Sequence, residues 1–194
     1  MSYVVYPYLV DLPQLRKVYG SNDMDMVTET ERHFTTYIDS FDDAYPDQGV
    51  EGAPTLIDAL RGIVSGQVRH VEHVEDVELY GYALQLLCMH LGVLLPNNEW
   101  DSLTARGLDI VARIDGLKEL NYATNPPIPL PQWTDFPGVT YITSQDAVEL
   151  VQFRPIDEFG SDRDRVWLER AQEQYRSWLH ESIRTQKAIV AFLE

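Results

Sequence analysis

The chain has 194 residues, 44% of them hydrophobic and 11% aromatic, which is enough to bury one substantial core and excludes a disordered chain. Its 31 acidic side chains outnumber its 15 basic ones and give a formal net charge of −16. Because a polyanion repels phosphate groups, we expect no nucleic-acid partner and no docking on an anionic membrane.

The first part of the chain predicts a strand followed by helices. Residues 2–10 are rich in tyrosine and valine and predict a strand, in which Pro7 indicates an edge position or a bulge. Asp11 is a suitable N-cap for a short helix that ends at Gly20. Apolar residues at helical spacing predict helices in two further segments, 21–41 and 54–64.

Residues 78–95 are apolar on nearly every side, which predicts a helix that is surrounded by the other elements. Pro96 is expected to end this helix, and Gly81 and Gly92 indicate the close approach of another backbone. The single cysteine, Cys88, excludes an internal disulfide and is expected to be a buried core residue. The preceding segment, 67–76, fits either an extended loop or the irregular beginning of the helix.

The last part of the chain begins with a helix, capped by Asp101 or Ser102, that runs to about Leu120, followed by the proline-rich segment 125–137. These prolines favour a stiff connector laid over the core, and a proline-motif ligand for a partner domain is the alternative. Beyond them the pattern predicts two more helices and two more strands, at 144–153, 161–184, 138–143 and 187–193. The final strand is continuously apolar, so we expect it to be central in its sheet.

Together these elements predict a helix-rich α+β fold in a single domain over residues 1–194. The small sheet is expected to consist of strands near 2–10, 138–143 and 187–193, packed around the apolar helix 78–95. The chain shows no internal repeat and no linker long enough to separate two domains.

The last third of the chain combines a Phe-Pro-Gly-Val-Thr-Tyr strand, at residues 136–141, with two capped helices and a closing apolar run at 188–192. In this it resembles the YfbM-like family of bacterial proteins of unknown function, in which a Phe-Pro-x-Val-x-Tyr strand precedes a helix, a long helix with inward aromatic residues and a final apolar strand. The opening strand and the helix around residues 80–84 are compatible with that pattern. The resemblance implies the fold, a bacterial cytosolic setting and a link to toxin–immunity neighbourhoods, and it carries over no catalytic residue.

The candidate metal ligands are His70 and His73, which share one face if this segment is helical and have acidic neighbours. The order of residues does not match the His-Glu-x-x-His pattern of zinc enzymes. Two solvated histidines in an acidic loop are the alternative interpretation.

Four residues are candidates for lining a ligand pocket beside the sheet: Tyr80, Tyr82, His90 and Trp133. Cys88 and His90 are two positions apart on the expected helix, so they point to different sides and cannot form a nucleophile–base pair. Glycine-rich phosphate loops, a Gly-x-Ser-x-Gly elbow and Cys-x-x-Cys pairs are absent, which argues against nucleotide, serine-hydrolase and zinc-ribbon functions. No cofactor is expected.

The favoured functional hypothesis is a protein-binding module, in particular an immunity-type inhibitor of a basic toxin, because the chain is acidic and carries no catalytic motif. The alternatives are a small-molecule-binding protein or enzyme with a pocket beside the sheet, and a self-associating structural domain. The partner is therefore expected to be a basic protein, and the chain itself a monomer or homodimer. A cytoplasmic location is expected because no segment has the length and apolar character of a membrane span.

Overall fold

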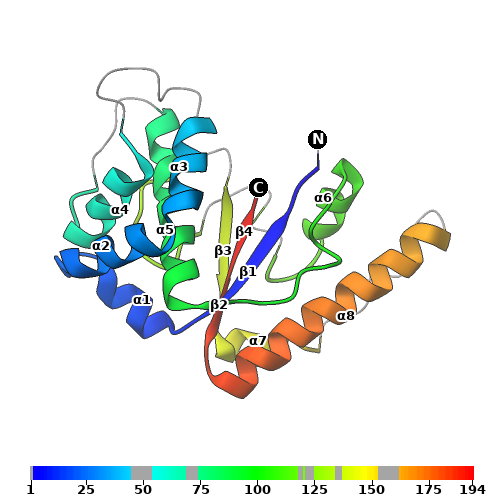
Figure 1. Cartoon of the computed structure of the whole chain (residues 1–194). Helices are drawn as coiled ribbons and strands as arrows, with labels where there is room; N and C mark the ends of the chain where they lie inside the picture. Colours follow the sequence, from blue (N-terminus) through cyan, green and yellow to red (C-terminus); the bar gives the residue numbers. More distant parts are fainter. Residues whose placement is uncertain are drawn as a thin grey trace.

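A four-stranded antiparallel sheet runs through the middle of the protein (Figure 1). The computed structural model describes residues 2–44, 54–68, 74–117, 120, 125–133, 137–152 and 162–194. The strands follow the order β2-β1-β4-β3, with bounds Val93–Leu94 for β2, Val5–Val10 for β1, Ala188–Leu193 for β4 and Gly138–Ile142 for β3. The three predicted strands are thus confirmed, and β2 is an addition that the sequence did not predict.

Strand β4 is central and buried at every position, as its unbroken apolar sequence predicted. It pairs with β1 over its whole length and with β3 on its other side. Successive side chains of a strand point to opposite faces, so Val190 and Phe192 enter one hydrophobic core while Ile189 and Leu193 enter another. A strand with apolar neighbours on both faces has no need of the polar alternation seen in half-exposed strands.

Helices cover both faces of the sheet, which gives three layers (Figure 1). One face packs against five helices, namely α1 (Leu12–Val18), α2 (Met24–His33), α3 (Thr35–Ala44), α4 (Leu56–Ser65) and α5 (Val74–Leu91). The other face packs against α6 (Ala105–Val111), α7 (Ser144–Leu150) and α8 (Asp162–Thr185). The predicted helix-rich α+β class is therefore confirmed.

Helix α5 is the surrounded helix that its sequence predicted, with Leu84, Leu86 and Leu87 fully buried. Its predicted end was wrong, because the helix stops at Leu91 and not at residue 95. A Cβ at Gly92 would lie only 2.9 Å from the main-chain oxygen of Leu9, so the chain turns at this glycine and pairs with β1 as strand β2. Within the described residues, no helix combines the length and apolar character needed to cross a bilayer.

Pro7 does not lie on an edge strand, since β1 sits between β2 and β4. Leu95 donates its N–H to the main-chain oxygen of Pro7, at 2.8 Å. The N–H and C=O groups of one residue in an antiparallel strand point toward the same neighbouring strand, so the N–H that Pro7 lacks would point toward β2. Strand β2 has already ended at Leu94, so its ladder does not need this donor. The proline is tolerated for the same reason that edge prolines are.

Several other boundaries differ from the prediction. The helix expected over 21–41 is divided at Phe34 into α2 and α3, and α6 is much shorter than the helix expected to reach Leu120. The expected helix 54–64 is α4, whose N-cap is Thr55. In the proline-rich segment, Ile128 and Trp133 are 4% and 3% exposed, as expected for a connector laid over the core.

Candidate functional site

Three of the four predicted pocket residues lie on α5, and the ring of Trp133 packs against the same helix, 2.8 Å from the position of a Cβ at Gly81. Tyr80 is buried against α4, where a Cβ at Gly62 would lie 3.1 Å from its ring. His90 lies beside His33, with 6.0 Å between the ring centroids. Trp133 donates its indole N–H to the main-chain oxygen of Pro137 at 2.7 Å, a bond that anchors the connector.

The two predicted metal ligands, His70 and His73, lie outside the described residues. In the part of the chain that the structure describes, no group of three or more His, Cys, Asp or Glu side chains could hold a metal ion. Cys88 is fully buried, as predicted, and burial raises the pKa of its thiol, so it is not an activated nucleophile.

The fourth predicted pocket residue, Tyr82, belongs to a polar cluster between the sheet and the helices α3 and α5. Its strand residues follow from the register of β1 and β4. Tyr6 pairs with Phe192, and Val4 exchanges two main-chain hydrogen bonds with Glu194, at 2.7 and 3.0 Å. Phe192 and Glu194 are two positions apart on the same extended chain, so their side chains point to the same face of the sheet. This is the face that packs against the helices of the first core.

The helices add aromatic rings and one amide to this face. From α3, Tyr37 and Phe41 stack with their ring centroids 6.4 Å apart. The Phe41 ring also lies 4.6 Å from the ring of Tyr82 on α5. Gln85, one turn further along α5, is only 2% exposed. We call these residues, with those from the sheet, the carboxylate–tyrosine cluster: Tyr6, Tyr8, Tyr37, Phe41, Tyr82, Gln85 and Glu194.

Four ionisable groups of the cluster are shifted toward their uncharged forms, those of Tyr6, Tyr8, Tyr37 and Glu194. Burial raises the pKa of the Glu194 carboxyl, and a hydrogen bond with Gln85 offsets part of that shift. Burial also raises the pKa of Tyr8 to about 12. The pKa values of Tyr6 and Tyr37 are raised first by burial and then by the charge of Glu194. The phenols of Tyr6, Tyr8 and Tyr37 therefore remain protonated at neutral pH, whereas the raised pKa of Glu194 starts from a much lower ordinary value.

The Oε1 atoms of Gln85 and Glu194 are both buried, and neither accepts a hydrogen bond from the described residues. Leaving a buried acceptor without a donor costs about 1–3 kcal/mol. The arrangement is therefore suited to a group that donates hydrogen bonds and, because one acceptor is a carboxylate, carries positive charge.

The sequence contained a partial signal for this cluster. Glu194 follows Val190 and Phe192 at the two-residue spacing of a strand, which places a carboxyl on a buried face. Gln85 interrupts an otherwise apolar helix. Nothing local to the sequence connects these residues to Tyr37, because only the packing of α3 over the sheet brings that ring to Glu194.

The pH dependence of stability should reveal the buried carboxyl. Because folding raises the pKa of Glu194, its stabilising contribution is present below the ordinary value of 4.5 and is lost as the pH rises through the folded-state pKa. A Glu194→Gln variant should match the wild type near pH 4 and become the more stable protein toward pH 8, in urea denaturation curves. Tyr6, Tyr8 and Tyr37 do not titrate in this range, because their pKa values are raised. Glu173→Gln, an exposed change, should show no such trend, and a Glu194→Gln advantage that shrinks with pH would contradict the assignment.

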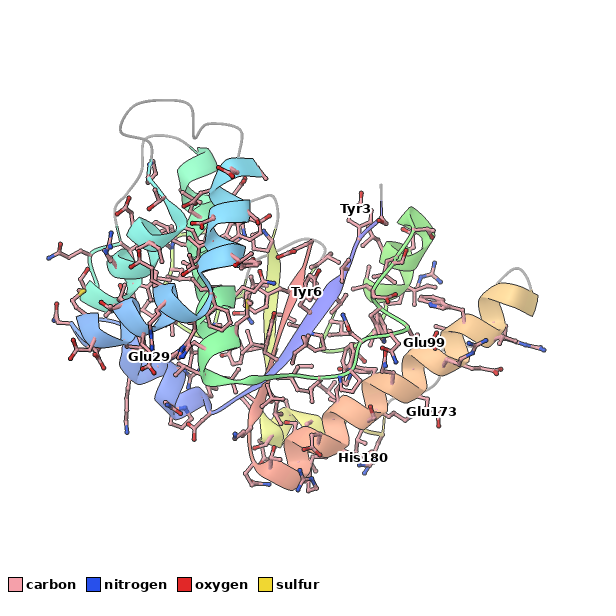
Figure 2. All side chains as sticks on the ribbon, viewed as in Figure 1. Tyr3, Tyr6, Glu29, Glu99, Glu173 and His180 are labelled. Atoms are coloured by element: carbon pink, nitrogen blue, oxygen red, sulfur yellow. The ribbon has the colours of Figure 1, made fainter. Side chains whose placement is uncertain are left out.

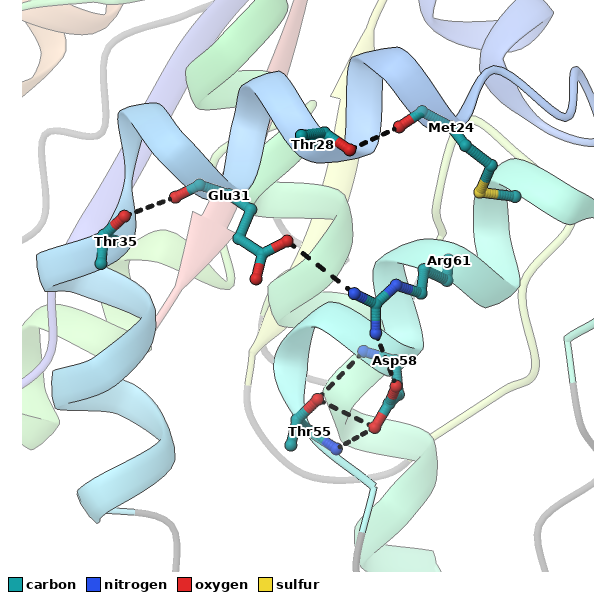
Figure 3. A network of polar contacts seen from close by, with 7 residues as sticks. All are labelled: Met24, Thr28, Glu31, Thr35, Thr55, Asp58 and Arg61. Carbon is teal, nitrogen blue, oxygen red and sulfur yellow. Dashed lines mark hydrogen bonds and ion pairs between the residues drawn. The ribbon is translucent and has the colours of Figure 1, made fainter.

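A second feature is an acidic face on the outer helices of the same layer. Including the N-cap Asp23, helices α2, α3 and α4 carry eight carboxylates against the guanidiniums of Arg32 and Arg61, a net charge of −6. Arg61 lies between two of the acids, 3.1 Å from Asp58 and 3.8 Å from Glu31 (Figure 3). By contrast, the long helix α8 has five acidic and five basic residues and is neutral. The acidic excess is thus concentrated on α2, α3 and α4 and absent from α8.

The fold and these two features define the class of protein: a three-layer α+β domain with an acidic helical face beside a buried carboxylate–tyrosine cluster. The family model described as "Domain of unknown function (DUF7691)" matches residues 1–194, and the chain belongs to this family. No curated protein and no solved structure matches the chain. The resemblance to the YfbM-like family stays a prediction.

Proposed function

We propose that this protein is a protein-binding module whose acidic face docks on a basic surface of its partner. The observation that carries the proposal is the net charge of −6 on helices α2 to α4, which have outward carboxylates such as Asp25, Glu29, Asp39 and Asp43. A concentrated field of one sign accelerates encounter with an oppositely charged surface and penalises partners of like charge. The specific form we propose is an immunity-type inhibitor of a basic toxin.

The test compares two variants with the same change in net charge. In the acidic-face variant, four exposed acids become amides: Asp25→Asn, Glu29→Gln, Asp39→Asn and Asp43→Asn. In the control, four exposed acids elsewhere are changed: Asp109→Asn, Glu149→Gln, Glu169→Gln and Glu173→Gln. Figure 2 shows Glu29 and Glu173 on opposite sides of the molecule.

A basic protein captured from a native lysate by the wild type should also be captured by the control and not by the acidic-face variant. With the purified partner, the association rate constant at low salt should fall about tenfold for the acidic-face variant and stay near the wild-type value for the control. If both variants lost capture of the partner equally, net charge alone would govern capture. The assignment of the acidic face on α2 to α4 as the docking surface would then be overturned. Suppression of the partner's toxicity by the wild type, and not by the acidic-face variant, tests the immunity-type role.

A second candidate function, binding of a small molecule beside the sheet, is favoured by the position of the carboxylate–tyrosine cluster between β1, β4 and the helices. The cluster contains one predicted pocket residue, Tyr82.

A further inference from the structure

The chemistry of the carboxylate–tyrosine cluster restricts what it can bind. Two of its acceptor atoms, Oε1 of Gln85 and Oε1 of Glu194, are buried without a donor among the residues that the structure describes. A neutral hydroxyl provides one donor, whereas an ammonium provides three and a guanidinium five, in each case with the positive charge that a buried carboxylate favours.

The aromatic rings around the acceptors favour the same kind of ligand. Tyr37, Phe41 and Tyr82 form a continuous set, with centroid distances of 6.4 and 4.6 Å between successive rings. These rings and that of Tyr6 are half-buried, so each has atoms at the surface of the protein. The faces of aromatic rings attract ammonium and guanidinium groups, and several rings beside one carboxylate are a recurrent arrangement for binding organic cations.

The acidic face borders this cluster, because both are built partly from α3. Tyr37 and Phe41 on that helix contribute rings to the cluster, while Asp39 and Asp43 on the same helix are exposed carboxylates of the acidic face. A cation that approaches α3 is therefore attracted by the surface before it reaches the buried carboxyl.

We propose that the carboxylate–tyrosine cluster binds an ammonium or guanidinium group, and that a lysine or arginine side chain of the basic partner supplies it. The proposal rests on the proposed function for the source of the cation. The cation donates to Oε1 of Glu194 and Oε1 of Gln85, and its alkyl chain lies along the rings of Tyr37 and Tyr82. The site would act as an anchor within a larger charged interface, as buried pockets do for a few dominant side chains of a partner.

The experiment uses the full chain and three probes: butylammonium, its neutral counterpart butanol, and a short peptide with one lysine between glycines. Binding is followed by calorimetry and by the ¹H–¹⁵N signal of the Gln85 side-chain amide. Butylammonium should saturate the wild type and shift that signal, while butanol should not. If butylammonium does not saturate, or shifts the signal no more than butanol does, the proposal is overturned.

Two variants locate the site, each with a matched control. Glu194→Gln and Tyr37→Leu should each weaken butylammonium binding about tenfold or more, while the controls Glu173→Gln and Tyr19→Leu should leave it unchanged. Glu194→Gln is expected to fold well, since it removes a buried charge. Binding that survives both site variants would place the cation elsewhere and end the proposal.

The experiments distinguish a partner side chain from a free amine as the source of the cation, and they test the cation site separately from the protein-binding role. Tighter binding of the lysine peptide than of butylammonium supports a partner side chain, and the reverse order supports a free amine and overturns the assignment to the partner. Loss of partner capture by the acidic-face variant, with capture unchanged in Glu194→Gln, would retain the docking face and reject the cation anchor. Cation binding without any partner capture would retain the anchor chemistry and reject the protein-binding role.

Discussion

A Trp178→Ala variant should lose about 3–5 kcal/mol of unfolding free energy. Trp178 is fully buried in the core between the sheet and α8, where its ring lies 5.7 Å from that of Trp100 and 6.0 Å from that of Tyr175. Its indole N–H donates to the main-chain oxygen of Pro96 at 2.6 Å. Alanine would therefore leave a large cavity and an acceptor without its donor.

The loss should be large because Trp178 is one of three tryptophans that join α8 to residues 96–100. Trp167 donates to the main-chain oxygen of Glu99 at 3.1 Å, and Trp100 donates to that of Ala171 at 3.2 Å. Since residues 96–100 begin two positions after β2 ends at Leu94, these bonds also help to fix the end of that short strand.

Chemical denaturation with fluorescence and circular dichroism would measure the effect. Trp178→Phe keeps a six-membered ring but loses the hydrogen bond and the volume of the pyrrole ring, so its loss should be smaller than that of Trp178→Ala. Trp167→Ala should also cost less than Trp178→Ala, because Trp167 is only half-buried. If Trp178→Ala lost less unfolding free energy than Trp167→Ala, the burial of Trp178 in this core would be contradicted.

A Gly138→Ala variant should lose about 3 kcal/mol or more, although the change adds a single methyl group. A Cβ at Gly138, at the start of β3, would overlap the main-chain oxygen of Leu120. That oxygen belongs to the backbone and cannot rotate away as the end of a flexible side chain can. Either β3 or the chain at Leu120 has to move, which disturbs the pairing of β3 with β4.

The matched control is Gly107→Ala in α6. Apart from its chain neighbours and the backbone of its own helix, the three heavy atoms nearest to a Cβ there all belong to the side chain of Leu103, from 3.1 Å, and alanine is the better helix former, so stability should change by less than about 1 kcal/mol. The unfolding free energies of the two variants are compared from the midpoints of their urea denaturation curves, which is valid if the slopes of the two transitions are equal. If the Gly138 variant were as stable as the Gly107 variant, the close approach at Leu120 would be disproved.

The predicted elements that proved correct are those whose signal is local. The periodic apolar residues of α5 and the unbroken apolar run of β4 each identified a buried element and its type. The end of α5 was wrong because residues 92–95 are as apolar as the helix before them. What decides their conformation is the backbone of β1, which accepts them as a strand where Gly92 permits close approach.

The candidate site shows the same limit more strongly. Tyr82 was predicted as a pocket residue, whereas Glu194, Tyr6 and Tyr37 were not. They lie far apart along the chain and come together through strand register and the packing of α3. The net charge of the chain likewise did not predict the concentration of acidic residues on α2, α3 and α4.

By itself, the sequence of this protein determined its class, because hydrophobic periodicity and net charge are properties of short segments and of composition. The tertiary structure decided where helix α5 ends, that β2 exists, and which carboxyl is buried among tyrosines. Those outcomes depend on contacts between segments that are remote in the sequence. The pKa of Glu194 is raised by desolvation, and desolvation occurs only when such contacts exclude water from the carboxyl group.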